Sequence, residues 1–212
     1  KNNKRSIKLT KKLVHEWLGN EKVDYGKKEK KDQVGTVTGL AYTSFGGDIL
    51  QIEATRFTGK GRLVLTGQLG DVMKESASIA LDYVRTHANE FKIDPKLFEE
   101  NDVHIHVPEG AVPKDGPSAG VTMTTALVSC FSNIPVKANL AMTGEVTLRG
   151  NVLPIGGLKE KSLAAHRSGI DTILIPKENV KDLDDVPQEV KDAVTFIPCS
   201  NVSQVLHNAL VK

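Results

Sequence analysis

A serine with a glycine two residues away on either side stands at the end of a loop rich in glycine and proline. Gly116, Ser118 and Gly120 form a Gly-x-Ser-x-Gly pattern, and a helix of small residues is predicted to begin at Ser118. Unpaired backbone N–H groups and the positive end of the helix dipole gather at such a position. A serine nucleophile there would have donors ready for an oxyanion. The alternative is that Ser118 only caps the helix, since serine is a favoured N-cap residue.

A nucleophilic serine needs a general base, and a buried lysine is one candidate. A lysine serves as a base only where burial lowers its pKa far enough to leave a neutral amine. Leu158, Lys161 and Ala165 share one face of the helix predicted over 158–168, so Lys161 stands on an apolar face. Lys161 is therefore either desolvated for chemistry or extends its amine to the surface.

A Ser-Asp-His triad is the second candidate arrangement. Asp184 and His207 follow Ser118 in the chain order that α/β-hydrolases use. That fold needs an apolar strand running directly into the serine turn. Here the preceding predicted strand ends near Val107 and a loop over 108–117 intervenes, which disfavours the triad. A serine esterase with this triad remains the alternative function.

Metal and nucleotide chemistry find little support in the sequence. His104 and His106 lie on one face of a predicted strand with Glu109 nearby, but the pattern supplies no definite third ligand for zinc. A polar strand face beside a cleft is the favoured interpretation. No Gly-x-x-x-x-Gly-Lys-Ser/Thr motif occurs, which excludes a P-loop nucleotide site within this chain.

The segments that must position these residues are a mixture of strands and helices. Alternation and short apolar runs predict strands over 36–43, 48–54, 62–67, 102–107, 140–143, 146–153, 172–175 and 196–197. Helical spacing predicts helices over 9–18, 71–91, 118–131, 158–168, 190–194 and 202–210. The apolar stripe of the helix at 71–91 is predicted to contain Val72, Ile79, Ala80, Tyr83 and Val84. Because the elements do not alternate regularly, the α+β class fits better than a doubly wound sheet.

The first 34 residues differ in charge from the rest. They contain 11 basic and 5 acidic side chains, a net charge of +6, whereas the other 178 contain 17 basic and 21 acidic side chains, a net charge of −4. A nucleic-acid module concentrates basic residues on its folded body, so no nucleic-acid partner is expected. The helix at 9–18 and the lysine-rich sequence after it predict either the last helix of an upstream domain or a helix packed on its own body.

Composition narrows the class of protein further. Hydrophobic residues make up 39% and charged residues 25%, which is typical of a soluble globular domain. The apolar runs are far shorter than the about 20 residues that a transmembrane helix needs, so no membrane partner is expected. Cys130 and Cys199 match no metal spacing or disulfide framework, which is typical of a reducing compartment. The first residues lack an apolar stretch resembling a signal peptide.

Three long motifs occur in order at 113–120, 142–150 and 153–161. Together they resemble the proteolytic domain of the Lon protease family, in its soluble bacterial and organellar branch. The resemblance implies a catalytic dyad of Ser118 as nucleophile and Lys161 as general base. It also implies that the Thr143 hydroxyl holds the lysine amine. Asp115 and Glu145 match acidic family positions beside the site, where they would tune the charge of the lysine or the conformation of the loop.

The resemblance also implies an architecture and a biological setting. Residues 34–212 would form a compact α+β domain similar to domain 2 of ribosomal protein S5, and residues 1–33 would be the C-terminal remnant of an AAA+ module with a linker. ATP and Mg²⁺ are expected in that module and no cofactor in this chain. The implied enzyme is an ATP-dependent serine endopeptidase, a homohexamer that degrades unfolded, damaged and regulatory proteins. The bacterial cytoplasm is the expected compartment and the mitochondrial matrix the second choice. A non-catalytic scaffold of the same fold is a further alternative, although it has no need of a lysine facing a serine.

Overall fold

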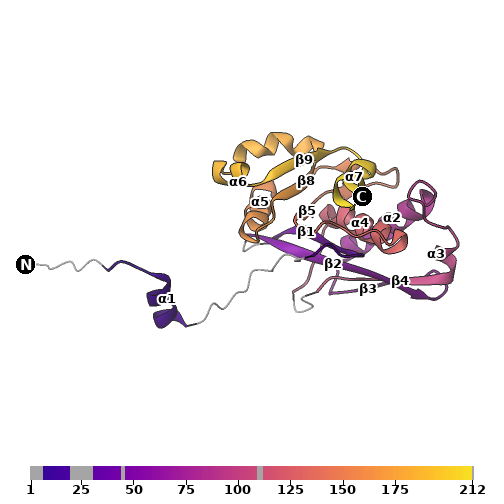
Figure 1. Cartoon of the computed structure of the whole chain (residues 1–212), viewed down its shortest axis with the longest axis horizontal. Helices are drawn as coiled ribbons and strands as arrows, with labels where there is room; N and C mark the ends of the chain where they lie inside the picture. The colour runs from indigo at the N-terminus through magenta and orange to yellow at the C-terminus, as the bar shows by residue number, and fades with distance from the viewer. Residues whose placement is uncertain (1–6, 20–30, 44–45, 109–111, 212) are drawn as a thin grey trace, which may run out of the picture.

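The computed structural model describes residues 7–19, 31–43, 46–108 and 112–211. Within these residues a seven-stranded sheet runs through the molecule (Figure 1). Across the sheet the strands follow the order β3 (Leu63–Thr66), β4 (Asn101–His106), β2 (Gly46–Thr58), β1 (Thr36–Thr43), β5 (Leu140–Met142), β8 (Thr172–Pro176) and β9 (Thr195–Cys199). Most of the lysine-rich joint, residues 20–30, and the possible metal ligand Glu109 lie outside the described residues.

The sheet is mixed, with antiparallel and parallel pairs. β2 pairs antiparallel with both β1 and β4, whereas the other neighbours are parallel. The last parallel strands are joined by helices, β5 to β8 through α5 (Leu158–Arg167) and β8 to β9 through α6 (Gln188–Ala193). The prediction that strands and helices do not alternate regularly is therefore confirmed for the first half of the chain. In the last third, strands and helices alternate, as parallel neighbours require a crossover connection.

Helices cover both faces of the sheet. Successive residues of a strand point to opposite faces, and accordingly Met142 and Leu174 belong to one apolar core whereas Ala141 and Ile173 belong to the other. The second core contains Leu158 and Ala165 of α5 and Val190 of α6. The first core contains the buried apolar side chains of α2 (Asp71–Thr86), α4 (Gly120–Ser132) and α7 (Val202–Ala209).

The helix α4 is buried along nearly its whole length. Every residue from Gly120 to Phe131 is buried, including four with hydroxyl groups. The Thr124 and Thr125 hydroxyls donate to the carbonyls of Gly120 and Val121 one turn earlier, so these two polar side chains need no partner outside the helix. A central, fully packed helix is a rigid support for the loop that precedes it.

The N-terminal helix α1 (Lys11–Leu18) stands apart from the sheet and its helices (Figure 1). The Thr10 side chain caps it by accepting the N–H of Leu13, and none of its residues is buried. The described residues therefore do not show it packed on its own body. After the gap at 20–30, the described residues contact the body from Asp32, whose Oδ1 accepts the N–H of Ala138 at 2.8 Å.

Four predicted elements differ clearly in the structure. The strand predicted over 48–54 is the longer β2, Gly46–Thr58. The helix predicted over 71–91 ends at Thr86, and its buried stripe contains Met73 rather than Val72, which is 43% exposed. Met73 belongs to the stripe because it lies one turn before Ala77 and two turns before Leu81. The strand predicted over 146–153 is a hairpin of two short strands, β6 (Glu145–Val146) and β7 (Val152–Leu153). The helix predicted from Ser118 begins later, as described below.

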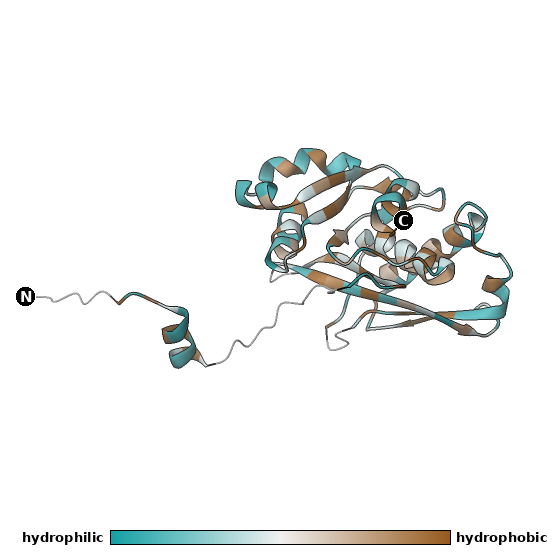
Figure 2. Ribbon diagram, viewed as in Figure 1, coloured by the Kyte–Doolittle hydropathy of each residue, from teal (hydrophilic) through white to brown (hydrophobic). Residues whose placement is uncertain are grey.

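Two further elements carry no prediction from the sequence. They are a 3-10 helix, η2 (Lys177–Asp185), and a single turn, α3 (Leu97–Glu100). Apolar segments lie mainly on the central strands and buried helices, whereas polar segments lie outside (Figure 2). Among the described helices, none has the length and apolar character needed to cross a membrane.

Candidate active site

Ser118 lies in a 3-10 turn, η1 (Pro117–Ala119), that leads into α4. The α-helix begins at Gly120 because the carbonyl of Ser118 accepts the N–H of Gly144 at 2.9 Å instead of a helical partner. Gly116, with φ of 117°, makes the sharp turn before it, a conformation that favours glycine. Neither η1 nor α4 receives a side-chain cap, so Ser118 does not serve as a helix cap.

Lys161 stands on the buried face of α5, as the sequence predicts. Only 2% of its surface is exposed, and Leu158, Ala164 and Ala165 of the same helix are buried with it. Because apolar surroundings disfavour the charged ammonium, burial lowers the pKa of Lys161 from 10.5 to about 8. The amine is therefore partly neutral near physiological pH, which is the state that a general base requires.

Thr143 links the lysine to the serine loop. Nζ of Lys161 donates to Oγ1 of Thr143 at 3.1 Å, and Oγ1 donates to the carbonyl oxygen of Ser118 at 3.4 Å. This is the contact that the family resemblance implies for Thr143. The neighbouring Gly144 strengthens the link, since its own carbonyl accepts the N–H of Val121 at 3.0 Å. The segment after β5 thus bonds both to the Lys161 amine and to the backbone of Ser118.

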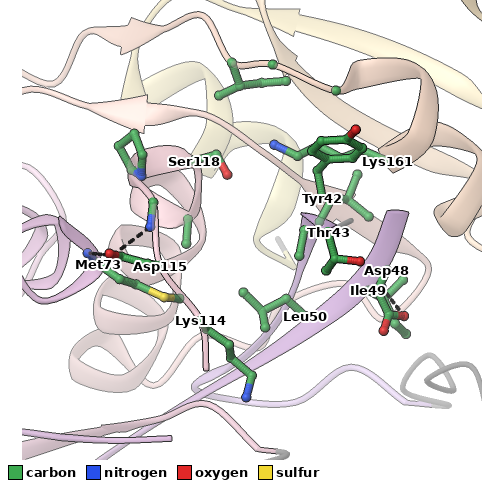
Figure 3. Close-up of a pocket in the computed structure, with 18 of the residues that line it drawn as sticks. Tyr42, Thr43, Asp48, Ile49, Leu50, Met73, Lys114, Asp115, Ser118 and Lys161 are labelled. Carbon is green, nitrogen blue, oxygen red and sulfur yellow. Dashed lines mark hydrogen bonds between the residues drawn. The ribbon is translucent and has the colours of Figure 1, made fainter. Parts of the chain in front are cut away.

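Ser118 and Lys161 line the same cavity, of about 450 Å³. Figure 3 shows the Ser118 hydroxyl and the Lys161 amine pointing into it from opposite sides. Among the described residues no hydrogen bond joins these two groups directly. Other lining residues come from the ends of β1 and β2, from α2 and from the loops before Ser118 and Lys161, and the apolar ones include Leu40, Tyr42, Ile49, Leu50, Met73, Val112 and Ile155. The cavity is lined mainly by apolar side chains, and its polar and charged lining residues are Thr43, Asp48, Lys114, Asp115, Ser118 and Lys161.

The two acidic positions implied by the resemblance occupy different places. Asp115 lines the cavity, but its Oδ1 accepts the N–H groups of Met73 at 3.0 Å and Gly116 at 2.8 Å (Figure 3). It forms no hydrogen bond with Lys161 among the described residues. Glu145 starts the β6–β7 hairpin, opposite Leu153, and is not among the residues that line the cavity.

Sequence reasoning missed two glycines that shape the site. A side chain on Gly47 of β2 would place its Cβ 2.0 Å from the carbonyl oxygen of Glu160 and 2.9 Å from the nitrogen of Lys161. A side chain on Gly70 would place its Cβ 2.2 Å from Cγ of Asp115. Each glycine allows a close approach of the chain to a candidate site residue. The adjacent Gly46 and Gly47 were a usable signal, since glycine inside a strand often marks such an approach.

The alternative triad is not assembled. Asp184 lies exposed in η2, and His207 lies exposed on α7, where it lines a separate groove of about 360 Å³ with Phe91. Neither residue lines the cavity of Ser118. The geometry therefore overturns the esterase arrangement of Ser118, Asp184 and His207.

The hydroxyl of one threonine lies within hydrogen-bond distance of both strand histidines. Oγ1 of Thr66 lies 2.8 Å from Nε2 of His104 and 2.7 Å from Nδ1 of His106. In the described part of the chain no group of three metal-binding side chains comes together. These histidines and Thr66 form a hydrogen-bonded polar group on β3 and β4.

Comparison with known proteins identifies the family of this chain. Residues 8–212 match the family described as Lon protease (S16) C-terminal proteolytic domain. The Lon protease of Brevibacillus choshinensis is 58% identical over 209 residues, covering 99% of this chain and 27% of that protein. The Lon protease of Bacillus thuringiensis (strain Al Hakam) is 59% identical over 208 residues, covering 98% of this chain and 26% of that protein. This chain thus spans about a quarter of the length of these curated relatives. With such identity over nearly all of its residues, the chain belongs to the Lon protease family and corresponds to its C-terminal serine-protease domain.

Proposed function

We propose that this chain is a serine endopeptidase domain in which Ser118 is the nucleophile and Lys161 the general base. The observation that carries the proposal is the buried amine of Lys161, whose pKa is lowered to about 8, in the same cavity as the Ser118 hydroxyl. Burying a lysine destabilises a fold, because the charged amine loses its hydration. A non-catalytic scaffold would gain nothing from that cost.

Thr143 leaves the lysine free to act as a base. A neutral amine has two N–H bonds and one lone pair, and one N–H is used in the bond to Oγ1 of Thr143. The Thr143 hydroxyl proton is directed to the carbonyl of Ser118, so it does not occupy the lone pair of Lys161. That lone pair accepts the proton of Ser118 Oγ while Oγ attacks the peptide carbonyl carbon.

The same lysine completes the first half of the reaction. Attack of Oγ on the peptide carbonyl gives a tetrahedral oxyanion. When it collapses, the C–N bond breaks and the Lys161 ammonium gives its proton to the leaving amine. Water then adds to the acyl-serine while the neutral amine accepts one of its protons. The C–Oγ bond of this second tetrahedral intermediate breaks, the Lys161 ammonium returns its proton to Ser118 Oγ, and the acid product leaves. The apolar wall of the cavity would receive an apolar portion of an extended, unfolded polypeptide.

Membership of the Lon protease family supports a proposal about the setting of the domain. We propose that residues 34–212 form a domain similar to domain 2 of ribosomal protein S5, and that residues 1–33 belong to the end of an AAA+ module and its linker. In this proposal ATP and Mg²⁺ bind that module, which feeds unfolded, damaged and regulatory proteins to a homohexamer in the bacterial cytoplasm. Glu145 would act there on the conformation of the hairpin beside the site.

The dyad is tested with three variants and a short fluorogenic peptide. We expect Ser118→Ala to abolish cleavage, and Lys161→Arg to do the same because arginine stays charged. The wild-type rate should rise with pH through about 8, the lowered pKa of Lys161, and level off above it. His207→Ala should cleave like the wild type. Sustained cleavage by Ser118→Ala, or loss of cleavage in His207→Ala, would contradict the proposal.

A further inference from the structure

The loop that carries Ser118 is fastened to the start of α2. The N–H of Gly70 donates to the carbonyl of Lys114 at 2.7 Å, and the N–H of Lys114 donates to the carbonyl of Gln68 at 3.1 Å. Oδ1 of Asp115 then accepts the N–H of Met73 at 3.0 Å. Two segments far apart in the sequence are thereby joined immediately before the catalytic turn.

Asp115 takes the place of a missing helix cap. The N-cap residue of α2 is Gly70, which has no side chain, and no side chain of the helix itself supplies a cap. An N-cap side chain normally accepts the N–H of the second or third helical residue. In α2 the third residue is Met73, and the oxygen that it meets comes from Asp115. The carboxylate also lies at the positive end of the helix dipole, which favours a negative charge.

Gly70 provides the space for this arrangement. A Cβ atom at position 70 would lie 2.2 Å from Cγ and 2.4 Å from Oδ2 of Asp115. Any side chain there would therefore push the carboxylate away from Met73. The absence of a side chain at Gly70 both leaves α2 without its own cap and admits a cap from the catalytic loop.

We infer that Asp115 is a positioning residue, and that Asp115 and Gly70 form a clasp that sets the place of the Ser118 loop on α2. The inference rests on the proposed function only in taking Ser118 as the nucleophile. The same Oδ1 that caps α2 also accepts the N–H of Gly116, whose φ of 117° turns the chain toward Ser118. Asp115 thus acts on the loop conformation, and not on the charge of Lys161.

Amide hydrogen exchange of the 212-residue chain tests the clasp without any need for activity. We expect the Met73 amide to exchange at least about tenfold faster in Asp115→Ala, because a helix cap is lost. Asp115→Asn keeps an oxygen that accepts both bonds, so its Met73 amide should stay within about threefold of the wild type. Gly70→Ala should speed exchange although Asp115 is intact. Equal Met73 exchange in wild type and Asp115→Ala would overturn the inference.

Peptide cleavage separates positioning from charge tuning. We expect Asp115→Ala and Gly70→Ala to lower kcat at least about tenfold with KM nearly unchanged, as for a displaced catalytic group. Asp115→Asn should restore most of kcat and keep the pH midpoint of the wild type. A shifted midpoint in Asp115→Asn would instead show that Asp115 sets the charge of Lys161, and would overturn the inference.

Asp71→Ala is the matched control for the charge at the same helix end. Asp71 is the first residue of α2, and its side chain is 95% exposed and, within the described part of the chain, forms an ion pair only with Lys74. This variant removes the same charge without touching the loop, so its kcat should equal the wild-type value. A loss of kcat as large as that of Asp115→Ala would overturn the clasp in favour of a helix-dipole effect.

Retained cleavage by Ser118→Ala would reject the proposed function alone, since Met73 exchange would still decide the clasp.

Discussion

Lys161 reduces the stability of the folded chain at neutral pH. Its pKa is lowered from 10.5 to about 8 in the folded state, whereas the unfolded chain keeps the ordinary value. Between these two pH values the unfolded chain binds more protons, so stability rises with pH there. Below pH 8 the whole cost is present, and it amounts to roughly 3 kcal/mol. A residue retained at such a cost is expected to have a function.

Replacing that amine should stabilise the domain. Lys161→Met keeps most of the side-chain volume but removes the charge. We expect it to raise the free energy of unfolding at pH 7 by about 1–3 kcal/mol. The gain is smaller than the full cost of the buried charge because the variant also loses the hydrogen bond to Thr143. The gain should shrink as the pH rises from 8 toward 10.5, the interval set by the two values of the pKa. Urea denaturation at pH 7 and pH 9.5 measures it.

Lys159 supplies the control for this prediction. It lies on the exposed side of the same helix, so Lys159→Met should change stability by no more than about 0.5 kcal/mol at either pH. A gain for Lys161→Met that stayed constant with pH would show that packing, and not the buried charge, is responsible.

At the level of elements, the site depends on β2 and α5 meeting without a side chain between them. Gly47 of β2 contacts the backbone of Glu160 and Lys161 so closely that a Cβ atom would lie 2.0 Å from the Glu160 carbonyl. Arg167 near the end of α5 donates to the carbonyl of Gly47 at 2.9 Å. The contact with β2 therefore fixes the position of α5 against the sheet. It thereby also fixes how far the Lys161 amine extends into the cavity.

Gly47→Ala should move the lysine. The added methyl group must displace either β2 or α5, which we expect to lower the free energy of unfolding by about 1–3 kcal/mol. Because Lys161 lies at the point of contact, kcat should fall at least about tenfold. Urea denaturation and peptide cleavage measure the two effects, with Lys159→Ala as a variant of α5 that leaves the contact intact. Unchanged kcat in a folded Gly47→Ala variant would contradict the role given to the contact.

The predictable part of the fold is the part that depends on local periodicity. The face of α5 that buries Lys161 follows from the spacing of Leu158, Lys161 and Ala165 alone. The 3-10 helix η2 was missed because three-residue turns do not produce the apolar stripe of an α-helix.

The contacts that complete the site join segments far apart in the sequence. The bond from Met73 to Asp115 spans 42 residues, and that from Lys161 to Thr143 spans 18. The hydrophobic periodicity of a single helix or strand does not predict such pairs. The second was expected only through the family resemblance, and the first was not expected at all. The β6–β7 hairpin was likewise hidden, since its strands are only two residues long.

The molecule as a whole separates into a basic N-terminal segment and a slightly acidic body. Residues 1–34 carry a net charge of +6 and the other 178 a net charge of −4. Every residue that lines the cavity lies between Leu40 and Lys161, outside the basic segment. Among the described residues, Asp32 and Gln33 are the earliest in the chain with a hydrogen bond to the body, to Ala138 and Val136.

Two shortened chains test where the body begins. A chain starting at Lys31 loses α1, none of whose residues is buried, so we expect its melting temperature and its peptide cleavage to equal those of the full chain. A chain starting at Gly35 also loses the bond from Asp32 to Ala138 and the pair of bonds between Gln33 and Val136. That loss should lower stability by about 1–3 kcal/mol, and so lower the melting temperature by roughly 2–10 °C. Thermal unfolding by circular dichroism compares the three chains at equal concentration. If the chain starting at Lys31 melted as early as the one starting at Gly35, α1 or the segment after it would have to stabilise the body. The two boundary residues would then not account for the difference.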